Sequence, residues 1–449
     1  MPDLIRTVSP STGEVVFERE GTSLEEVASM LSRAQIAHQS FRKVPLETRK
    51  SYVLRALDNL VAWKEELSQE LTRQMGRPTA VASTEITTMI KRAEYLLENA
   101  CASLADIPGQ NEPGFRRWVS KESVGPVLII AAWNFPWLIT INTLVPAILA
   151  GNSVILKPSP QTPLVAERFL AAFAAAGLPA DVLQVLHSGS YAKLESIVQC
   201  PGIKQICFTG STAIGLAIRR ATADRIVPLN LELGGNDPAY VRPDANLDWT
   251  AANIVDGAVF NSGQSCCAVE RVYVHESVHD AFVRAVQHHL DGYKVGDPTD
   301  GATSIGPVIS QTALRNIQNQ IEDALAKGAI DATPTKIGST VLPETGNYLI
   351  PRILTNVTHD MAVMTSETFG PVIPIMKVRD DAEAVSLMND SEYGLTASIW
   401  TQDIGRGEVL EREIEAGTVY INRCDYPSPV SIDILSKRSA IGSRRNGNY

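Results

Sequence analysis

Two apolar segments, VLIIAA at residues 127–132 and SVILKP at residues 153–158, decide the fold class of this chain. Each has the length of a strand, and similar runs follow at residues 182–186 and 203–208, with helical segments between them. Continuous apolar strands separated by helices are typical of a parallel sheet covered on both faces. We therefore expect an α/β fold in which ligands bind beyond the carboxyl ends of the strands.

The segments around these strands predict further helices and a second sheet. One long helix is expected from Leu46 to Met75, where Gly76 and Pro78 would end it. After Glu232 the alternation of strands and helices resumes, which indicates a second α/β domain. Residues 116–121 alternate in polarity and form either a protruding strand that bridges subunits or an ordinary edge strand.

Composition and charge restrict the class of protein. The chain has 449 residues, 44% hydrophobic and 20% charged, which is typical of a globular protein of about two or three domains. The formal net charge of -10 argues against a nonspecific nucleic-acid binder and against a basic membrane-binding surface. Six cysteines without paired metal-ligand spacing indicate reduced thiols, an intracellular location and no metal site.

The sequence also predicts a cytoplasmic protein without a membrane span. Its N-terminus has no apolar signal core. The most apolar stretch, residues 124–151, is interrupted by Pro126, Pro136 and Pro146. Because a membrane span needs about 20 uninterrupted apolar residues, we expect this stretch to be buried core.

A cysteine and a glutamate, each on a glycine-flanked turn, suit covalent catalysis. Cys266 lies in NSGQSCCA at residues 261–268, and Glu232 lies in LELGGNDP at residues 231–238. A thiolate can attack a carbonyl carbon, and a carboxylate can activate the water that releases the product. Each fragment alone proves little, because a lone cysteine is usually buried filler. If the turn leads into a strand, Cys266 and its neighbour Cys267 should point in opposite directions, one to the cleft and one to the core.

Two segments that follow predicted strands carry candidate groups for binding a phosphorylated ligand. FTGSTAIG at residues 208–215 opens a helix, whose amide groups and dipole attract phosphate. Alternatively, Ser211 or Thr212 serves only as the helix cap. Lys157 ends a strand, where it either binds a ribose or phosphate or is simply solvated.

Two other segments carry groups that suit the reacting centre. Asn134, in AAWNFPW at residues 131–137, offers an amide that can hold an oxyanion, or it forms a turn before proline. Glu367 stands two residues before Phe369, so the pair can hold a ribose and a planar ring. The alternative is a surface glutamate beside a core phenylalanine.

In this order, the segments resemble the aldehyde dehydrogenase superfamily, from about Ser9 to about Asn422. The glutamate and cysteine motifs are highly specific to that family. The resemblance implies a Rossmann-like cofactor domain, a second α/β catalytic domain and a small bridging β element. The expected limits are 1–104 with 123–232 for the NAD(P)-binding domain, 105–122 for the bridging strands, 233–421 for the catalytic domain and 422–449 for an atypical tail.

The resemblance also assigns catalytic roles. It implies that Cys266 is the nucleophile, Cys267 its non-catalytic neighbour and Glu232 the general base. Asn134 would hold the oxyanion together with the backbone N–H of Cys266. The implied reaction oxidises an aldehyde to a carboxylate through a thiohemiacetal and a thioester, which Glu232 helps to hydrolyse.

The cofactor-binding residues implied by the resemblance are Trp133, Lys157, Gly210, Ser211, Thr212, Gly215, Glu367 and Phe369. Those at 210–215 lie near the pyrophosphate, and Lys157 contacts the adenosine ribose. Glu367 and Phe369 hold the nicotinamide ribose and ring, and Trp133 lines the cofactor cleft.

Two departures from the family pattern affect these expectations. Pro160 stands where many NAD-preferring relatives carry a glutamate, so the cofactor is NAD or NADP, with a slight preference for NAD from family frequency. The segment at residues 430–449 is short and basic, and it lacks the family pattern. We expect the protein to act on a small aldehyde. We also expect it to form a homo-oligomer whose association is weakened by this tail. The alternative is a non-catalytic relative impaired by the tail.

Overall fold

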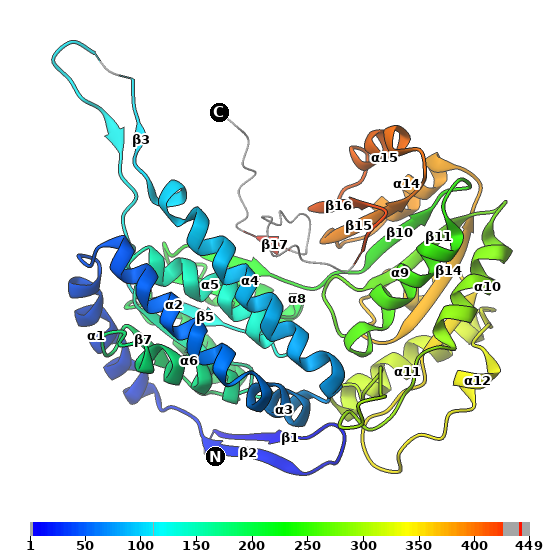
Figure 1. Ribbon diagram of the computed structural model, residues 1–449, viewed down its shortest axis with the longest axis horizontal. Coiled ribbons are helices and arrows are strands. Elements are labelled where there is room, and N and C mark those ends of the chain that lie inside the picture. The colour runs from blue at the N-terminus through cyan, green and yellow to red at the C-terminus, as the bar shows by residue number, and fades with distance from the viewer. Residues whose placement is uncertain (1–2, 111, 425–439, 442–449) are drawn as a thin grey trace.

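The computed structural model describes residues 3–110, 112–424 and 440–441. Two large sheets, each flanked by helices, stand side by side, and two small two-stranded ribbons lie outside them (Figure 1). The predicted α/β class with a Rossmann-like part, a second α/β part and a small β element is confirmed. No helix in the described part of the chain has the length and apolar character that a membrane span requires.

The first sheet contains the strands expected from the apolar runs. Its strand order is β17-β9-β8-β5-β6-β7. The strands are β5 (Val127–Ile130), β6 (Val154–Lys157), β7 (Leu183–Val185), β8 (Gln205–Thr209), β9 (Leu229–Glu232) and β17 (Ala440–Ile441). The first five are parallel, and β17 pairs antiparallel with β9.

Alternating side chains of these strands pack into two separate cores. In β5, Val127 and Ile129 join one apolar cluster and Leu128 and Ile130 join another, as the two-residue period of a strand requires. The helices of the first cluster are α2 (Leu46–Ala62), α3 (Lys64–Met75), α4 (Thr79–Leu104), α5 (Pro136–Leu149) and α6 (Leu164–Ala175). Those of the second are α1 (Leu24–Phe41), α7 (Tyr191–Val198) and α8 (Thr212–Ala221).

The prediction of a single helix from Leu46 to Met75 is wrong in one respect. The chain breaks at Trp63, whose φ of -94° and ψ of 5° end α2 and begin α3. The predicted end is confirmed, because Gly76 caps α3 in the left-handed conformation with φ of 77°.

The second sheet has the strand order β12-β13-β14-β11-β10-β15-β16. Its strands are β10 (Asp237–Val241), β11 (Val269–His275), β12 (Ile330–Asp331), β13 (Arg352–Thr355), β14 (Val372–Val378), β15 (Thr396–Trp400) and β16 (Thr418–Ile421). The longer helices around it are α9 (Leu247–Val259), α10 (His279–Leu290), α11 (Gln311–Ala326), α14 (Asp381–Asn389) and α15 (Ile404–Glu411). The short helical turns are η1 (Phe260–Gly263), α12 (Thr335–Gly338) and α13 (Ala362–Thr365). The chain passes from one sheet to the other between Glu232 and Asp237.

Two ribbons complete the described structure. One consists of β1 (Leu4–Val8) and β2 (Val15–Glu20), and the other of β3 (Ile107–Pro108) and β4 (Trp118–Val119). Figure 1 shows the β3–β4 ribbon projecting from the body of the molecule beyond the end of α4. The polarity alternation at residues 116–121 therefore gives a short strand in a protruding ribbon.

Candidate active site

The carboxyl ends of four parallel strands place most of the predicted residues along one edge of the first sheet. Lys157 ends β6, Asn134 follows β5, Gly210 follows β8 and Glu232 ends β9. From β5 the chain proceeds to β6 and β7 on one side, and β8 and β9 lie on the other side. Such a reversal of strand order is where open α/β sheets bind ligands.

The cysteine loop runs from η1 to β11 and contains backbone in the left-handed region. Asn261 has φ of 52°, Ser262 of 60° and Gly263 of 73°. Cys266 is half-buried and Cys267 is buried. Their Sγ atoms lie 3.7 Å apart, and both residues line the same cavity. The expectation that the two thiols point in opposite directions is therefore wrong. Ala268 N donates to Ser265 O at 3.1 Å, and this turn separates the cysteines from the alternation of β11.

The glycine turn after Glu232 touches the cysteine loop directly. A Cβ atom at Gly235 would lie 2.4 Å from the carbonyl oxygen of Cys266, and one at Gly234 would lie 2.4 Å from Oε2 of Glu367. At Gly235 the neighbouring atom belongs to the backbone, so only glycine fits there, whereas the Glu367 side chain could shift to admit a Cβ atom at Gly234. The glutamate motif, the cysteine motif and Glu367 therefore form one contiguous site.

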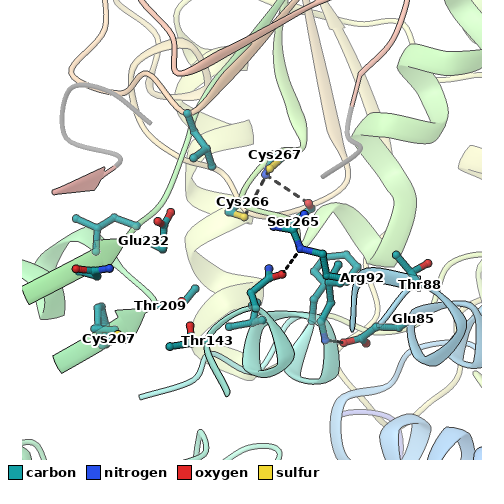
Figure 2. Close-up of a pocket in the computed structure, with 18 of the residues that line it drawn as sticks. Glu85, Thr88, Arg92, Thr143, Cys207, Thr209, Glu232, Ser265, Cys266 and Cys267 are labelled. Carbon is teal, nitrogen blue, oxygen red and sulfur yellow. Dashed lines mark hydrogen bonds between the residues drawn. The ribbon is translucent and has the colours of Figure 1, made fainter. Parts of the chain in front are cut away.

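Cys266 and Glu232 line the same cavity of about 760 Å³. Figure 2 shows both residues at this cavity, with Arg92 and Thr88 of α4 and Thr143 of α5 in its wall. The cavity is large enough for a small organic substrate. A thiol and a carboxylate that share one cavity can act in sequence on the same bound molecule.

Asn134 is placed beside the cysteine loop. It is buried in the turn between β5 and α5, and its Nδ2 donates to the carbonyl of Gln264 at 3.2 Å. An amide nitrogen carries two hydrogens, so the same atom can donate to an oxyanion as well.

Sequence reasoning missed Arg77 and Glu85, which support this turn. Both are buried and form an ion pair. Arg77 also donates to the carbonyl of Asn134 and, at 3.1 Å, to Oδ1 of Asn261. Glu85 accepts from the backbone N–H of Trp137 at 2.8 Å, at the start of α5. Burial raises the pKa of Glu85, although the Arg77 guanidinium lowers it. The only sequence signal was an arginine directly after the helix-ending Gly76.

The residues at 210–215 fit a phosphate-binding helix start. Ser211 is the N-cap residue of α8, but its side chain makes no capping hydrogen bond. Among the described atoms, Thr212 Oγ1 is buried without a hydrogen-bond partner. A Cβ atom at Gly215 would lie 2.4 Å from Leu233 Cδ2, so this glycine allows close packing of α8 on the chain after β9. The helix start therefore suits the pyrophosphate of a dinucleotide.

Lys157 is buried at the end of β6, and its Nζ donates to the carbonyl of Pro158 at 3.2 Å. Burial lowers the pKa of Lys157 to about 8, and the Asp3 carboxylate opposes this shift. A nearby anion would stabilise the charged form of an ammonium group buried in this way.

Trp133 and Phe369 meet in space although they are far apart in sequence, and Glu367 lies two residues before Phe369. The rings of Trp133 and Phe369 pack edge to face with centroids 5.6 Å apart. Glu367 Oε1 accepts from Gly235 N at 3.1 Å, and burial raises the pKa of Glu367 to about 7. This arrangement offers a carboxyl group and an aromatic ring to a ribose and a planar base.

Comparison with known proteins identifies the family of the chain. The model of the aldehyde dehydrogenase family matches residues 2–449. The chain is 33% identical over 447 residues to succinate-semialdehyde dehydrogenase (NADP+) 1 of Mycobacterium ulcerans, covering 99% of this chain and 96% of that protein.

Solved structures agree as well. The NADP-dependent glyceraldehyde-3-phosphate dehydrogenase of Bacillus halodurans, complexed with NADP, is 33% identical with a TM-score of 0.91, covering 98% of this chain and 91% of that one. The NAD-dependent aldehyde dehydrogenase of Sinorhizobium meliloti is 29% identical with a TM-score of 0.90, covering 98% and 87%. The chain therefore belongs to the aldehyde dehydrogenase family and is an NAD(P)-dependent enzyme that oxidises an aldehyde.

Proposed function

We propose that Cys266, Glu232 and Asn134 carry out the oxidation of an aldehyde to a carboxylic acid in this protein. The observation that carries the proposal is that Cys266 and Glu232 line one cavity, while the turn after Glu232 touches the Cys266 backbone. The relatives described above give no support to the non-catalytic alternative.

The residues act in two stages. The Cys266 thiolate adds to the carbonyl carbon of the aldehyde, and the oxyanion receives hydrogen bonds from Asn134 Nδ2 and the backbone N–H of Cys266. NAD(P)+, which Trp133, Lys157, Glu367, Phe369 and the helix start at 210–215 would hold, would supply the hydride acceptor for this two-electron oxidation of the substrate carbon. This leaves a thioester on Cys266, and Glu232 takes a proton from the water that attacks it. The acid leaves and the thiolate is restored.

Exchange of each cysteine for serine in turn distinguishes the roles of the two thiols in the reaction. Cys266→Ser should lower kcat on the order of a thousandfold or more, because a hydroxyl is a far weaker nucleophile than a thiolate. Cys267→Ser is the matched control and should keep most of the activity. Aldehyde-dependent formation of reduced nicotinamide measures both. Comparable losses in the two variants would contradict the assigned roles.

We propose NADP+ as the preferred cofactor, in place of the slight preference for NAD that family frequency gave. Trp133, Lys157, Glu367, Phe369 and the helix start at 210–215 would hold it. Pro160 has no carboxylate to repel a 2′-phosphate, and the buried ammonium of Lys157 ends the preceding strand. The Mycobacterium ulcerans relative carries NADP+ in its name. These observations support a cofactor with a phosphate on its adenosine ribose.

The preference for NADP+ over NAD+ should fall as the pH rises through about 8, the pKa to which burial lowers Lys157. Below that pH the charged amine attracts the 2′-phosphate, and above it the amine is neutral. The ratio of the two dissociation constants, measured one pH unit below and above this value, tests the expectation. Lys157→Arg stays charged and should show a flat ratio. A parent ratio that does not change with pH would count against Lys157.

We propose that the substrate aldehyde carries a carboxylate at its other end. Thr84, Thr88 and Arg92 recur every four residues on α4 and line the cavity that contains Cys266. Arg92 lies about 10 Å along the helix axis from the level of Glu85. Its Nε donates to Asn142 Oδ1 of α5 at 2.7 Å, which fixes the guanidinium in the wall. Succinate semialdehyde, named for the Mycobacterium ulcerans relative, has such a terminal carboxylate.

Arg92→Gln should raise KM for succinate semialdehyde roughly 10- to 100-fold, because a charge-assisted hydrogen bond contributes about 1.5–3 kcal/mol. KM for an uncharged aldehyde of equal length should change little. Asp256 also lines the cavity, so Asp256→Asn is the control. This variant should not weaken binding of the acidic substrate. Preference of the parent for an amino aldehyde or for glyceraldehyde 3-phosphate would refute the proposed substrate class.

We propose that the β3–β4 ribbon mediates a homo-oligomer. It presents exposed apolar side chains: Ile107, Phe115, Trp118 and Val119. Such a projecting apolar surface suits a second copy of the chain. Of the C-terminal tail at 422–449, which we predicted to weaken this assembly, only 422–424 and 440–441 lie among the described residues. The domain limits given above and a cytoplasmic location stay predictions.

Trp118→Glu should shift the oligomer toward monomer, because it places a charge in the apolar contact. The measurement is molar mass by light scattering at several protein concentrations. Val341→Glu introduces the same charge at another exposed apolar residue and should leave the mass unchanged. A monomeric parent protein, or an unchanged mass for the Trp118 variant, would rule out this interface.

A further inference from the structure

We propose that Glu270 is a positioning residue for the cofactor: it clamps the segment 367–370 so that Glu367 and Phe369 face the nicotinamide half of the molecule. This inference rests on the proposed role of Glu367 and Phe369 in holding NAD(P). It adds a residue on another strand that controls their placement.

Two hydrogen bonds form the clamp. Glu270 is buried in β11, and its Oε2 accepts from the backbone N–H of Thr368 at 2.8 Å. Its Oε1 accepts from the backbone N–H of Phe369, also at 2.8 Å. One carboxylate therefore holds two consecutive amides, which fixes both the position and the orientation of the segment.

The segment needs such a clamp because its backbone is strained and tightly enclosed. Phe369 has φ of 51°, a conformation that is unfavourable for a residue with a side chain. At Gly370 a Cβ atom would lie 2.4 Å from Ile317 Cδ1, and at Gly263 one would lie 2.3 Å from the carbonyl oxygen of Gly370. Without the clamp, Phe369 would relax, and its edge-to-face contact with Trp133 would be lost.

Glu270 also affects the charge of its neighbours. Burial raises the pKa of Glu270, and repulsion from the carboxylates of Glu367 and Asp237 raises it further. Two carboxylates buried side by side do not both ionise freely. The charge on Glu270 therefore influences the ionisation of Glu367, the group proposed to accept hydrogen bonds from the nicotinamide ribose.

The clamp lies close in sequence to the proposed nucleophile. Glu270 follows Cys266 by four residues, where the cysteine turn has become the regular strand β11. The turn that carries the sulfur therefore continues directly into the strand that carries Glu270. The distance between the thiol-bound carbon and the hydride acceptor depends on this common support.

Glu270→Gln tests the clamp, since glutamine keeps the shape but accepts only one of the two N–H groups. Isothermal titration calorimetry should show roughly tenfold weaker binding of NADP+. The value of kcat should fall, while KM for the aldehyde and alkylation of Cys266 by iodoacetamide without cofactor stay near the parent values. Glu270→Asp, which keeps the carboxylate on a shorter stem, should bind NADP+ with intermediate affinity.

Asp244→Asn is the matched control, because Asp244 also holds two consecutive amides. Its Oδ2 accepts from Gln402 N at 2.9 Å and Asp403 N at 2.8 Å, away from the residues assigned to the site. It should lower the temperature of thermal unfolding without changing cofactor affinity.

Three results would overturn the clamp: parental NADP+ affinity in Glu270→Gln, equal loss of affinity in Asp244→Asn, or parental affinity in Glu270→Asp if the glutamine variant does not fold. Failure of the proposed function would look different. A parent protein that binds NADP+ but oxidises no aldehyde would contradict that function, and the titrations would still test Glu270.

Discussion

The geometry of the site depends on the ion pair and hydrogen bonds of the buried Arg77 guanidinium. A charge removed from water must be paired and hydrogen-bonded, and here the partners come from α4, from the turn after β5 and from the cysteine loop. The group also lies over the Phe135 ring, 4.4 Å from its centroid. Because loss of one partner of a buried ion pair costs about 3–5 kcal/mol, these three segments cannot move apart independently.

A second constraint is the close approach of backbone to backbone at glycines. The turn after Glu232 lies against the Cys266 carbonyl, and the segment after Glu367 lies against Gly263. Buried carboxylates accept hydrogen bonds from the same two segments: Glu367 from Gly235 N, and Glu270 from Thr368 N and Phe369 N. The glycines allow the close approach and the carboxylates orient the segments, so Glu232 and Cys266 occupy fixed positions although they adjoin different sheets.

Much of this architecture was predictable from local sequence. The strands at 127–132 and 153–158 and their neighbours could be recognised because a strand buried on both faces needs a continuous apolar run. The motifs around Cys266 and Glu232 carried the family resemblance, and that family is confirmed. The roles of the individual site residues and the domain limits stay predictions.

Other features were hidden because they depend on contacts between distant residues. Arg77 and Asn261 are 184 positions apart, and no periodicity relates them. Glu270 looks like any strand residue until the segment at 367–370 is folded over it. The break at Trp63 interrupts a pattern whose helical period continues on both sides, so the sequence alone favoured one helix. The direction of Cys267 depended on where the turn ends and the strand begins.

The short strand β17 has a consequence for the integrity of the molecule. Its backbone pairs with β9, so that Ala440 lies opposite Glu232 and Ile441 opposite Leu231. In the described part of the chain, β17 thereby covers the outer margin of the first sheet. If proteolysis cut the chain just before residue 440 and released β17, then β9, the strand that ends at Glu232, would become the edge strand of the first sheet. Unpaired N–H and C=O groups would then be open to strands of other molecules, and the first sign of trimming would be aggregation.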